Sequence, residues 1–212
     1  EIYTSLFVGS VRCVKRQVTN VQDENLWSQS NSTINNCAGD MDMSKDGTVL
    51  VCREEAGNAQ IDIRTYLSNS SNSSWSVMDS SNSPFPSRGS DGTWAQAISL
   101  SDNGEVFALS SPIHWGDTRY QTGPGAVWVF SRNGNTWSNK NNTSFSGGSE
   151  NNAGIRGVSD GDYFGVSISL NSDGSRIAVG AHFADGTKEN GDGIANAGHI
   201  RVFEWTEITG QN

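Results

Sequence analysis

The sequence has few apolar residues and no long apolar run, and this excludes two broad classes of structure. Only 34% of its 212 residues are hydrophobic. No stretch keeps the apolar period of about 3.6 residues through several helical turns, so long amphipathic helices are not expected. No run of about 18 apolar residues occurs, so the sequence has no candidate membrane span. The 24 glycines instead favour short strands joined by many turns.

Basic residues are also scarce, and this argues against a nucleic-acid partner. The chain has 14 Lys and Arg against 23 Asp and Glu, so its net charge is -9. A chain of this charge is repelled by a phosphate backbone. We therefore expect no nucleic-acid partner; the protein and glycan partners that we do expect follow from the repeats and loops described below.

There are only three cysteines, Cys13, Cys37 and Cys52. No Cys-x-x-Cys motif or His/Cys cluster accompanies them, so a zinc site is not expected. Cys37 and Cys52 fall on the two strands of one predicted hairpin and project from the same face, but out of register, so a disulfide between them would need some distortion from ideal pairing. Cys13 is an alternative partner. In a reducing environment all three would be small core residues.

Three hairpins of equal length recur along the chain. Their turns are 43–47, 100–104 and 170–174, and each ends in Asp-Gly or Asn-Gly. Alternating apolar positions coincide on both sides of the turn without a gap. The matching sets are Met41, Ile98 and Ile168; Leu50, Phe107 and Ile177; and Cys52, Leu109 and Val179.

A third strand is predicted after each hairpin, at 59–63, 125–130 and 198–203. A Trp then follows (Trp75, Trp137 and Trp205) and is expected to pack between sheets at the start of an outermost strand. A four-stranded unit that recurs at a period of roughly 60 residues indicates an all-β fold of antiparallel β-propeller blades. The expected divisions are 1–36, the end of a preceding blade, and blades at 37–93, 94–163 and 164–212.

The last unit resembles the FG-GAP repeat of the integrin α-chain propeller. It carries Phe164-Gly165, Gly180-Ala181 and the strand 198–202, Gly-His-Ile-Arg-Val, at the positions of the family motif. The middle unit departs from the motif, with Trp94-Ala95 in place of Phe-Gly. The tryptophan-aspartate propeller repeat is a rival resemblance with a similar turn. The FG-GAP resemblance implies an extracellular or cell-surface propeller with a role in adhesion.

Integrin-type calcium loops are absent from the three turns, because each turn is too short to supply the oxygens that calcium needs. The Asp and Asn residues in these turns are better explained as turn formers. Another loop, with Asp185, Glu189 and Asp192, could bind Ca²⁺; the alternative is a solvated acidic loop. No other cofactor is expected.

No catalytic residues are assigned. His182 and His199 are predicted to be structural or exposed. The loop with Trp115, Asp117 and Tyr120 could stack on a sugar ring, unless its Trp only anchors the loop. Glycosylation sequons begin at Asn31, Asn69, Asn72 and Asn141. Chance occurrence in an Asn- and Ser-rich chain is the alternative.

These features predict a non-enzymatic, extracellular propeller with a structural or adhesive role. Its partners would be further blades of the same polypeptide or other protein subunits, because an isolated arc of blades exposes apolar faces. The apparent start inside a repeat favours the first. A lectin-like propeller and part of a larger propeller enzyme are the alternatives.

Overall fold

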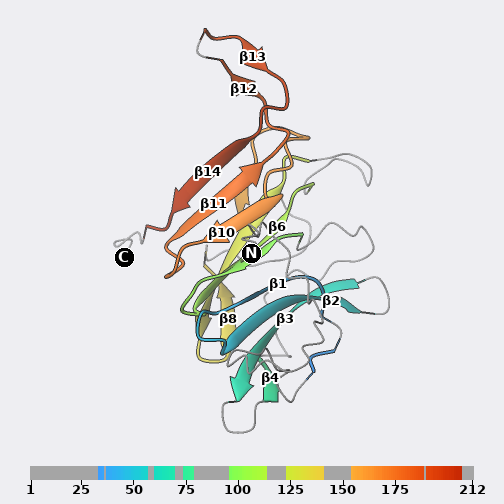
Figure 1. The fold of residues 1–212 in the computed structure, drawn as a ribbon, viewed down its shortest axis with the longest axis vertical. Coiled ribbons are helices and arrows are strands. Elements are labelled where there is room, and N and C mark those ends of the chain that lie inside the picture. The colour runs from blue at the N-terminus through green and yellow to red at the C-terminus, as the bar shows by residue number, and fades with distance from the viewer. Residues whose placement is uncertain are drawn as a thin grey trace, which may run out of the picture. The chain divides into compact units, whose positions relative to one another are not determined.

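The computed structural model describes residues 33–35, 37–56, 60–69, 74–78, 96–113, 123–140, 154–188 and 190–206. The described residues form antiparallel sheets and contain no helix. Three sheets follow one another along the chain, together with one short hairpin (Figure 1). The all-β fold of antiparallel meanders predicted from the sequence is confirmed.

The first sheet runs in the order β1-β2-β3-β4. The middle sheet runs β5-β6-β7-β8, and β9 pairs with the other half of β7. The last sheet runs β10-β11-β14, and a hairpin of β12 and β13 precedes β14. The strands are β1 Cys37–Met43, β2 Val49–Ala56, β3 Gln60–Asn69, β4 Ser74–Met78, β5 Ile98–Leu100, β6 Val106–Ser111, β7 Ala126–Asn133, β8 Thr136–Asn139, β9 Ile155–Arg156, β10 Ser167–Leu170, β11 Arg176–Ala181, β12 Gly186–Thr187, β13 Gly193–Ile194 and β14 His199–Glu204.

The strand registers agree with the alignment of the three hairpins. Met41 faces Cys52 in the first sheet. The matching pairs are Ile98 with Leu109 and Ile168 with Val179. Third strands begin close to their predicted starts. β3 continues to Asn69, well beyond the predicted end at residue 63.

The turn residues act as the sequence suggested. The Asp46 carboxylate accepts hydrogen bonds from the Thr48 backbone N–H at 3.0 Å and from the Ser44 hydroxyl at 2.7 Å. Asn103 and Asp173 accept the corresponding backbone bonds, each at 3.0 Å. In each turn, the Asp or Asn side chain thus accepts a hydrogen bond from a backbone N–H two residues further along the chain.

Each sheet has two faces with different neighbours. We call the face on the side of the following sheet in the sequence the forward face, and the opposite face the rear face. In the last sheet, the forward face is the one turned away from the middle sheet. The forward face of the first sheet packs on the rear face of the middle sheet, and Val49, Val51, Phe107 and Leu109 lie in this core. The forward face of the middle sheet packs in the same way on the last sheet, around Val106, Val129, Ile177 and Val179. Face-to-face packing of consecutive meanders is the arrangement of propeller blades.

The turn glycines lie where these sheets meet. Gly174 has φ +70°, and an added Cβ would lie 2.4 Å from the Cβ of Val106 in the middle sheet. Gly104 likewise approaches Val49 of the first sheet, at 2.9 Å from its Cγ2. A side chain at either position would therefore meet both a disfavoured backbone and a steric clash.

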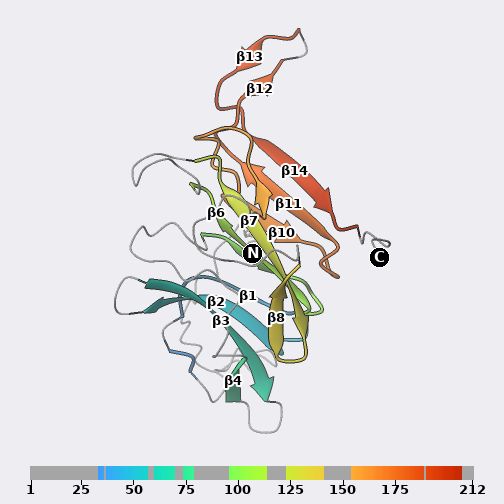
Figure 2. The ribbon, with the colours of Figure 1, turned by 180° about the vertical axis from the view of Figure 1, so that it is seen from behind.

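The tryptophans do not repeat as predicted. Trp75 lies on β4 opposite Ser68, and Trp137 lies on β8 opposite Arg132, as expected for an outermost strand (Figure 2). The prediction that Trp205 is equivalent to these two residues is wrong. Its backbone N–H donates to the Ser175 carbonyl, just as Arg132 donates to Glu105, so Trp205 occupies the Arg132 position at the end of the third strand.

Candidate protein-binding surface

Side chains on each forward face accept hydrogen bonds from the backbone of the next sheet. The Asp42 carboxylate accepts the Leu100 N–H at 2.7 Å. Ser99, which aligns with Asp42, accepts the Leu170 N–H through its hydroxyl at 2.9 Å. The two interfaces thus repeat both their apolar packing and one polar contact.

The forward face of the last sheet is exposed. Ile200 and Val202 are 73% and 68% exposed, whereas the aligned Val127 and Val129 of the middle sheet are 0% and 8% exposed. At one end of this apolar stripe Arg176 and Glu204 form an ion pair at 3.1 Å. An apolar stripe bordered by a charged pair is typical of a surface that binds another protein.

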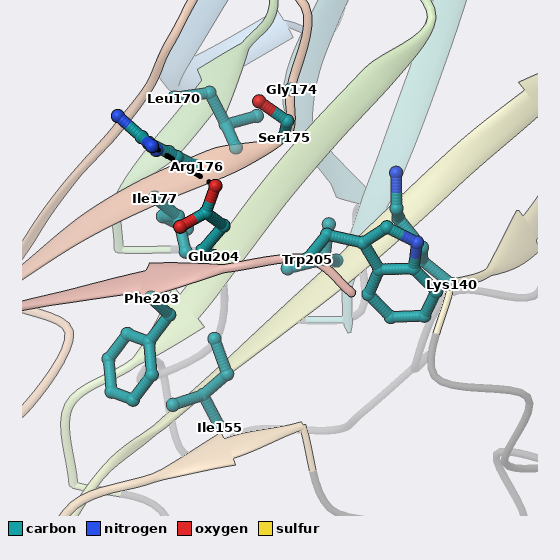
Figure 3. Close-up of a pocket in the computed structure, with 11 residues that line it drawn as sticks. Lys140, Ile155, Leu170, Gly174, Ser175, Arg176, Ile177, Phe203, Glu204 and Trp205 are labelled. Atoms are coloured by element: carbon teal, nitrogen blue, oxygen red, sulfur yellow. Dashed lines mark hydrogen bonds and ion pairs between the residues drawn. The ribbon is translucent and has the colours of Figure 1, made fainter. Parts of the chain in front are cut away.

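A groove of about 180 Å³ lies between the middle and last sheets, beside β14. Val129 and Ile155 contribute to it from the middle sheet, and Leu170, Ile177 and Phe203 from the last. Figure 3 shows Trp205 and Lys140 together at one side of this groove. The Lys140 ammonium lies 5.0 Å from the centroid of the Trp205 ring, a distance at which a cation is attracted by the ring face.

Cys37 and Cys52 form a disulfide in the first sheet. Cys37 lies opposite Glu54 and Cys52 opposite Met41, and the register shifts between the two pairs. The irregularity brings the two Cα atoms to 5.8 Å, an ordinary separation for a disulfide. Cys13, the alternative partner, lies outside the described residues.

The proposed calcium ligands are only partly described. Asp185 accepts the Asn196 backbone N–H at 3.0 Å, and Asp192 accepts a bond from the Asn190 amide at 2.7 Å. Glu189 lies outside the described residues. Across the described part of the chain, no three His, Cys, Asp or Glu side chains are grouped closely enough to bind a metal. The calcium site stays a prediction.

Other predicted site residues fall largely beyond the described ranges. The glycan-binding candidates Trp115, Asp117 and Tyr120 lie outside them, as do Asn31, Asn72 and Asn141. Asn69 is exposed at the end of β3. His182 contacts the Phe183 ring, with centroids 4.0 Å apart, and His199 begins β14.

Two exposed turn carboxylates titrate below their usual range. Hydrogen bonds from the Ser44 hydroxyl, then from Thr48, lower the pKa of Asp46. The Ser175 hydroxyl and backbone N–H lower the pKa of Asp173 in the same way. Burial, followed by the charge of Glu54, raises the pKa of Tyr66 on the first sheet. The carboxylate shifts come from turn formation, so they do not indicate an acid or base prepared for catalysis.

The exposed stripe and the groove were not predicted from the sequence. A signal was present in the hairpin alignment, because Arg176 falls at the position of the buried Val49 and Val106. A charge at that position indicates a forward face without the cover that the other two have. Among the described residues there is no helix long and apolar enough to cross a membrane.

No protein-family model and no curated protein sequence matches the chain. Solved structures that resemble it include a proposed 6-phosphogluconolactonase from Bacteroides uniformis, at 14% identity and a TM-score of 0.34. TolB from Acinetobacter baumannii is another, at 14% identity and a TM-score of 0.28. The two matches cover 82% and 78% of this chain. They cover only 52% of the lactonase chain and 43% of the TolB chain. The three sheets are assigned as propeller blades because of their strand order and the two apolar cores between them.

Proposed function

We propose that this chain is an extracellular propeller module with a structural or adhesive role, which binds protein partners and does no catalysis. The observation that carries the proposal is the exposed Ile200–Val202 stripe on the last sheet. The same face is covered in both preceding sheets, so the stripe has the geometry of an interface that lacks its partner. The partner would be a further blade, in the same polypeptide or in another subunit.

Two features support an extracellular location. The Cys37–Cys52 disulfide is of a kind that persists in oxidising compartments. Asn69 begins an Asn-Ser-Ser sequon and is exposed. The resemblance of the last unit to FG-GAP repeats agrees with an adhesive role, and we propose membership of that group on the motif residues alone.

The interaction claim is tested by site-specific photo-crosslinking. In native material, a photoreactive residue at position 200 should crosslink to a further segment of its own polypeptide or to a second protein, and Ile200→Asp should abolish binding of a second protein. The matched control places the same photoreactive residue at Thr187, an exposed position on the β12–β13 hairpin. Equal yields at both positions would show that the stripe is not an interface.

The location claim needs a separate measurement on native material. Enzymatic removal of N-linked glycan converts an occupied Asn to Asp, and we expect this conversion at Asn69 or another sequon. A native protein with no glycan and with reduced cysteines would contradict an extracellular assignment while leaving the protein-binding role untouched.

A further inference from the structure

The sequence contains three Asn-Gly pairs, a dipeptide prone to spontaneous deamidation. Glycine has no side chain to keep its backbone nitrogen away from the side chain of the preceding Asn. That nitrogen attacks the Asn side chain only when its N–H makes no hydrogen bond and the side chain is free to turn toward it. All three pairs lie within the described residues, and the structure distinguishes between them: Asn103-Gly104, Asn133-Gly134 and Asn190-Gly191.

The Asn103-Gly104 pair is held in place by its own turn. The Asn103 side-chain oxygen accepts hydrogen bonds from the Ser101 hydroxyl at 2.7 Å and from the Glu105 N–H at 3.0 Å. The Gly104 N–H donates to the Ser101 carbonyl at 2.9 Å. Gly104 also lies against Val49 of the first sheet, so this turn has no room to rearrange. Attack at this pair would have to break several contacts at once.

The Asn190-Gly191 pair, in the connection between β12 and β13, is also hydrogen-bonded. The Asn190 side chain donates to the Asp192 carboxylate at 2.7 Å and accepts the Asp192 N–H at 3.2 Å. The Gly191 N–H donates to the Lys188 carbonyl at 2.9 Å. Both the attacking nitrogen and the side chain that it would attack are therefore engaged elsewhere.

The Asn133-Gly134 pair has none of these restraints. Asn133 ends β7, and the two residues after it connect to Thr136 at the start of β8. Asn133 and Gly134 are exposed, and within the described residues neither the Gly134 N–H nor the Asn133 side-chain amide has a hydrogen-bond partner. Asn133 and Thr136 form the last pair between the two strands, and terminal pairs open most readily. The backbone rotation that brings the nitrogen to the side chain therefore costs little here.

We propose that Asn133 is a site of spontaneous deamidation and isomerisation. The Gly134 nitrogen forms a bond to Cγ of Asn133 and loses its proton, and the side-chain amide nitrogen leaves as ammonia. The product is a cyclic imide. Water, the only other reactant, then opens the ring at either of its two carbonyl carbons, which gives aspartate or isoaspartate. This modification is independent of the proposed protein-binding role.

The isoaspartate product disturbs β8, because it routes the main chain through the side-chain carbon of residue 133 and so lengthens the strand connection by a methylene group. The register of a hairpin is determined by its turn. A shift of β8 displaces Trp137, whose ring contacts Phe107 edge-on with centroids 4.7 Å apart and whose indole N–H donates to the Thr65 hydroxyl at 3.1 Å. The modification thus weakens the core between the first and middle sheets.

The test ages the full chain at physiological temperature and mildly alkaline pH, followed by peptide mapping with a fragmentation method that separates isoaspartate from aspartate. Asn133 should convert at least about tenfold faster than Asn103 or Asn190, because those sites must first lose hydrogen bonds of roughly 1 kcal/mol each. Both isoaspartate and aspartate should appear at position 133. An intact Asn133, faster conversion at either other pair, or aspartate alone, which direct hydrolysis gives, would overturn the proposal.

Two variants separate the chemistry from its structural effect. Gly134→Ala should slow conversion of Asn133 by about tenfold, because the methyl group crowds the attacking nitrogen. The added Cβ meets nothing within 4 Å, so the variant introduces no clash. Asn133→Asp carries the new charge on a normal main chain and should unfold at the wild-type urea midpoint, whereas the purified isoaspartate form should unfold at lower urea. An unchanged conversion rate in Gly134→Ala, or equal midpoints for the two acidic forms, would contradict the account.

Discussion

The middle and last sheets share one hairpin design but differ in what covers them. In the middle sheet both faces are buried and β8 borders β7, and Trp128, Phe107 and Phe130 lie at 1% exposure or less. In the last sheet only the rear face is buried, and Arg201 stands at the position of Trp128. The comparison shows that the repeat specifies the sheet itself, whereas the side chains on each face specify its neighbours.

The largest expected difference concerns the two tryptophans that the sequence had matched. Trp137→Ala removes a buried ring and should lower the free energy of unfolding by about 3 to 5 kcal/mol. Trp205 is 39% exposed and its ring contacts the Lys140 ammonium at the side of an open groove, so Trp205→Ala should cost only about 1 kcal/mol. Urea unfolding of both variants measures the difference. Equal losses would mean that the two residues do occupy equivalent places.

A substitution at the turn glycine Gly174 should disrupt the contact between the middle and last sheets. Gly174→Ala should destabilise by about 2 to 3 kcal/mol, because the new Cβ meets Val106 in a backbone conformation that already disfavours it. Gly134 has a similar φ of +62° but nothing within 4 Å of an added Cβ. Gly134→Ala should therefore cost only about 1 kcal/mol. If the two variants lose the same stability, the clash with Val106 is not real.

A smaller difference in stability is expected between Ser99 and Ser169, which are aligned on the forward faces of the middle and last sheets. Ser99→Ala leaves the Leu170 N–H without its acceptor and should cost about 1 to 2 kcal/mol. Ser169, at the same position in the last sheet, is exposed, so Ser169→Ala should change stability by less than about 0.5 kcal/mol. Thermal unfolding resolves this pair. A larger loss for Ser169→Ala would show that the last forward face is already covered.

The turns differ in their response to acid. Asp173 has a lowered pKa in the folded state, so its contribution to stability is complete above its ordinary value of 3.8 and is lost as pH falls through the folded pKa. Asn103 makes the same turn without a charge. Asp173→Asn should therefore keep the neutral-pH stability and reduce the loss on acidification. Urea unfolding at neutral pH and below pH 3.8 tests this, and identical acid losses for variant and wild type would contradict it.

The fold could be predicted because the pattern that carries it is local. Alternation around the turns ending at Gly47, Gly104 and Gly174 determines both strands and their register, and the registers found agree with the alignment. The third strands were placed by the same alternation. The end of β3 lies beyond the predicted one because alternation stops after Ile63, where Tyr66 and Leu67 stand side by side, and only pairing with β2 and β4 makes this part a strand.

The candidate surface depended on information that alternation does not contain. Ile200 and Val202 read as core residues, since an alternating strand cannot reveal whether its face has a neighbour. Trp205 and Trp137 were matched because each comes after a third strand, but their spacing differs. Trp205 directly follows β14, whereas Trp137 comes after a turn and lies on β8.

The stability of two aligned valine variants tests the central claim most directly, because Val129 and Val202 occupy the same position on the forward faces of the middle and last sheets. Val129 is 8% exposed, so Val129→Ala should lower the free energy of unfolding by about 1 to 3 kcal/mol. Val202 is 68% exposed, so Val202→Ala should change it by less than about 0.5 kcal/mol. Equal losses for the two variants would show that the forward face of the last sheet is already covered and would contradict the account.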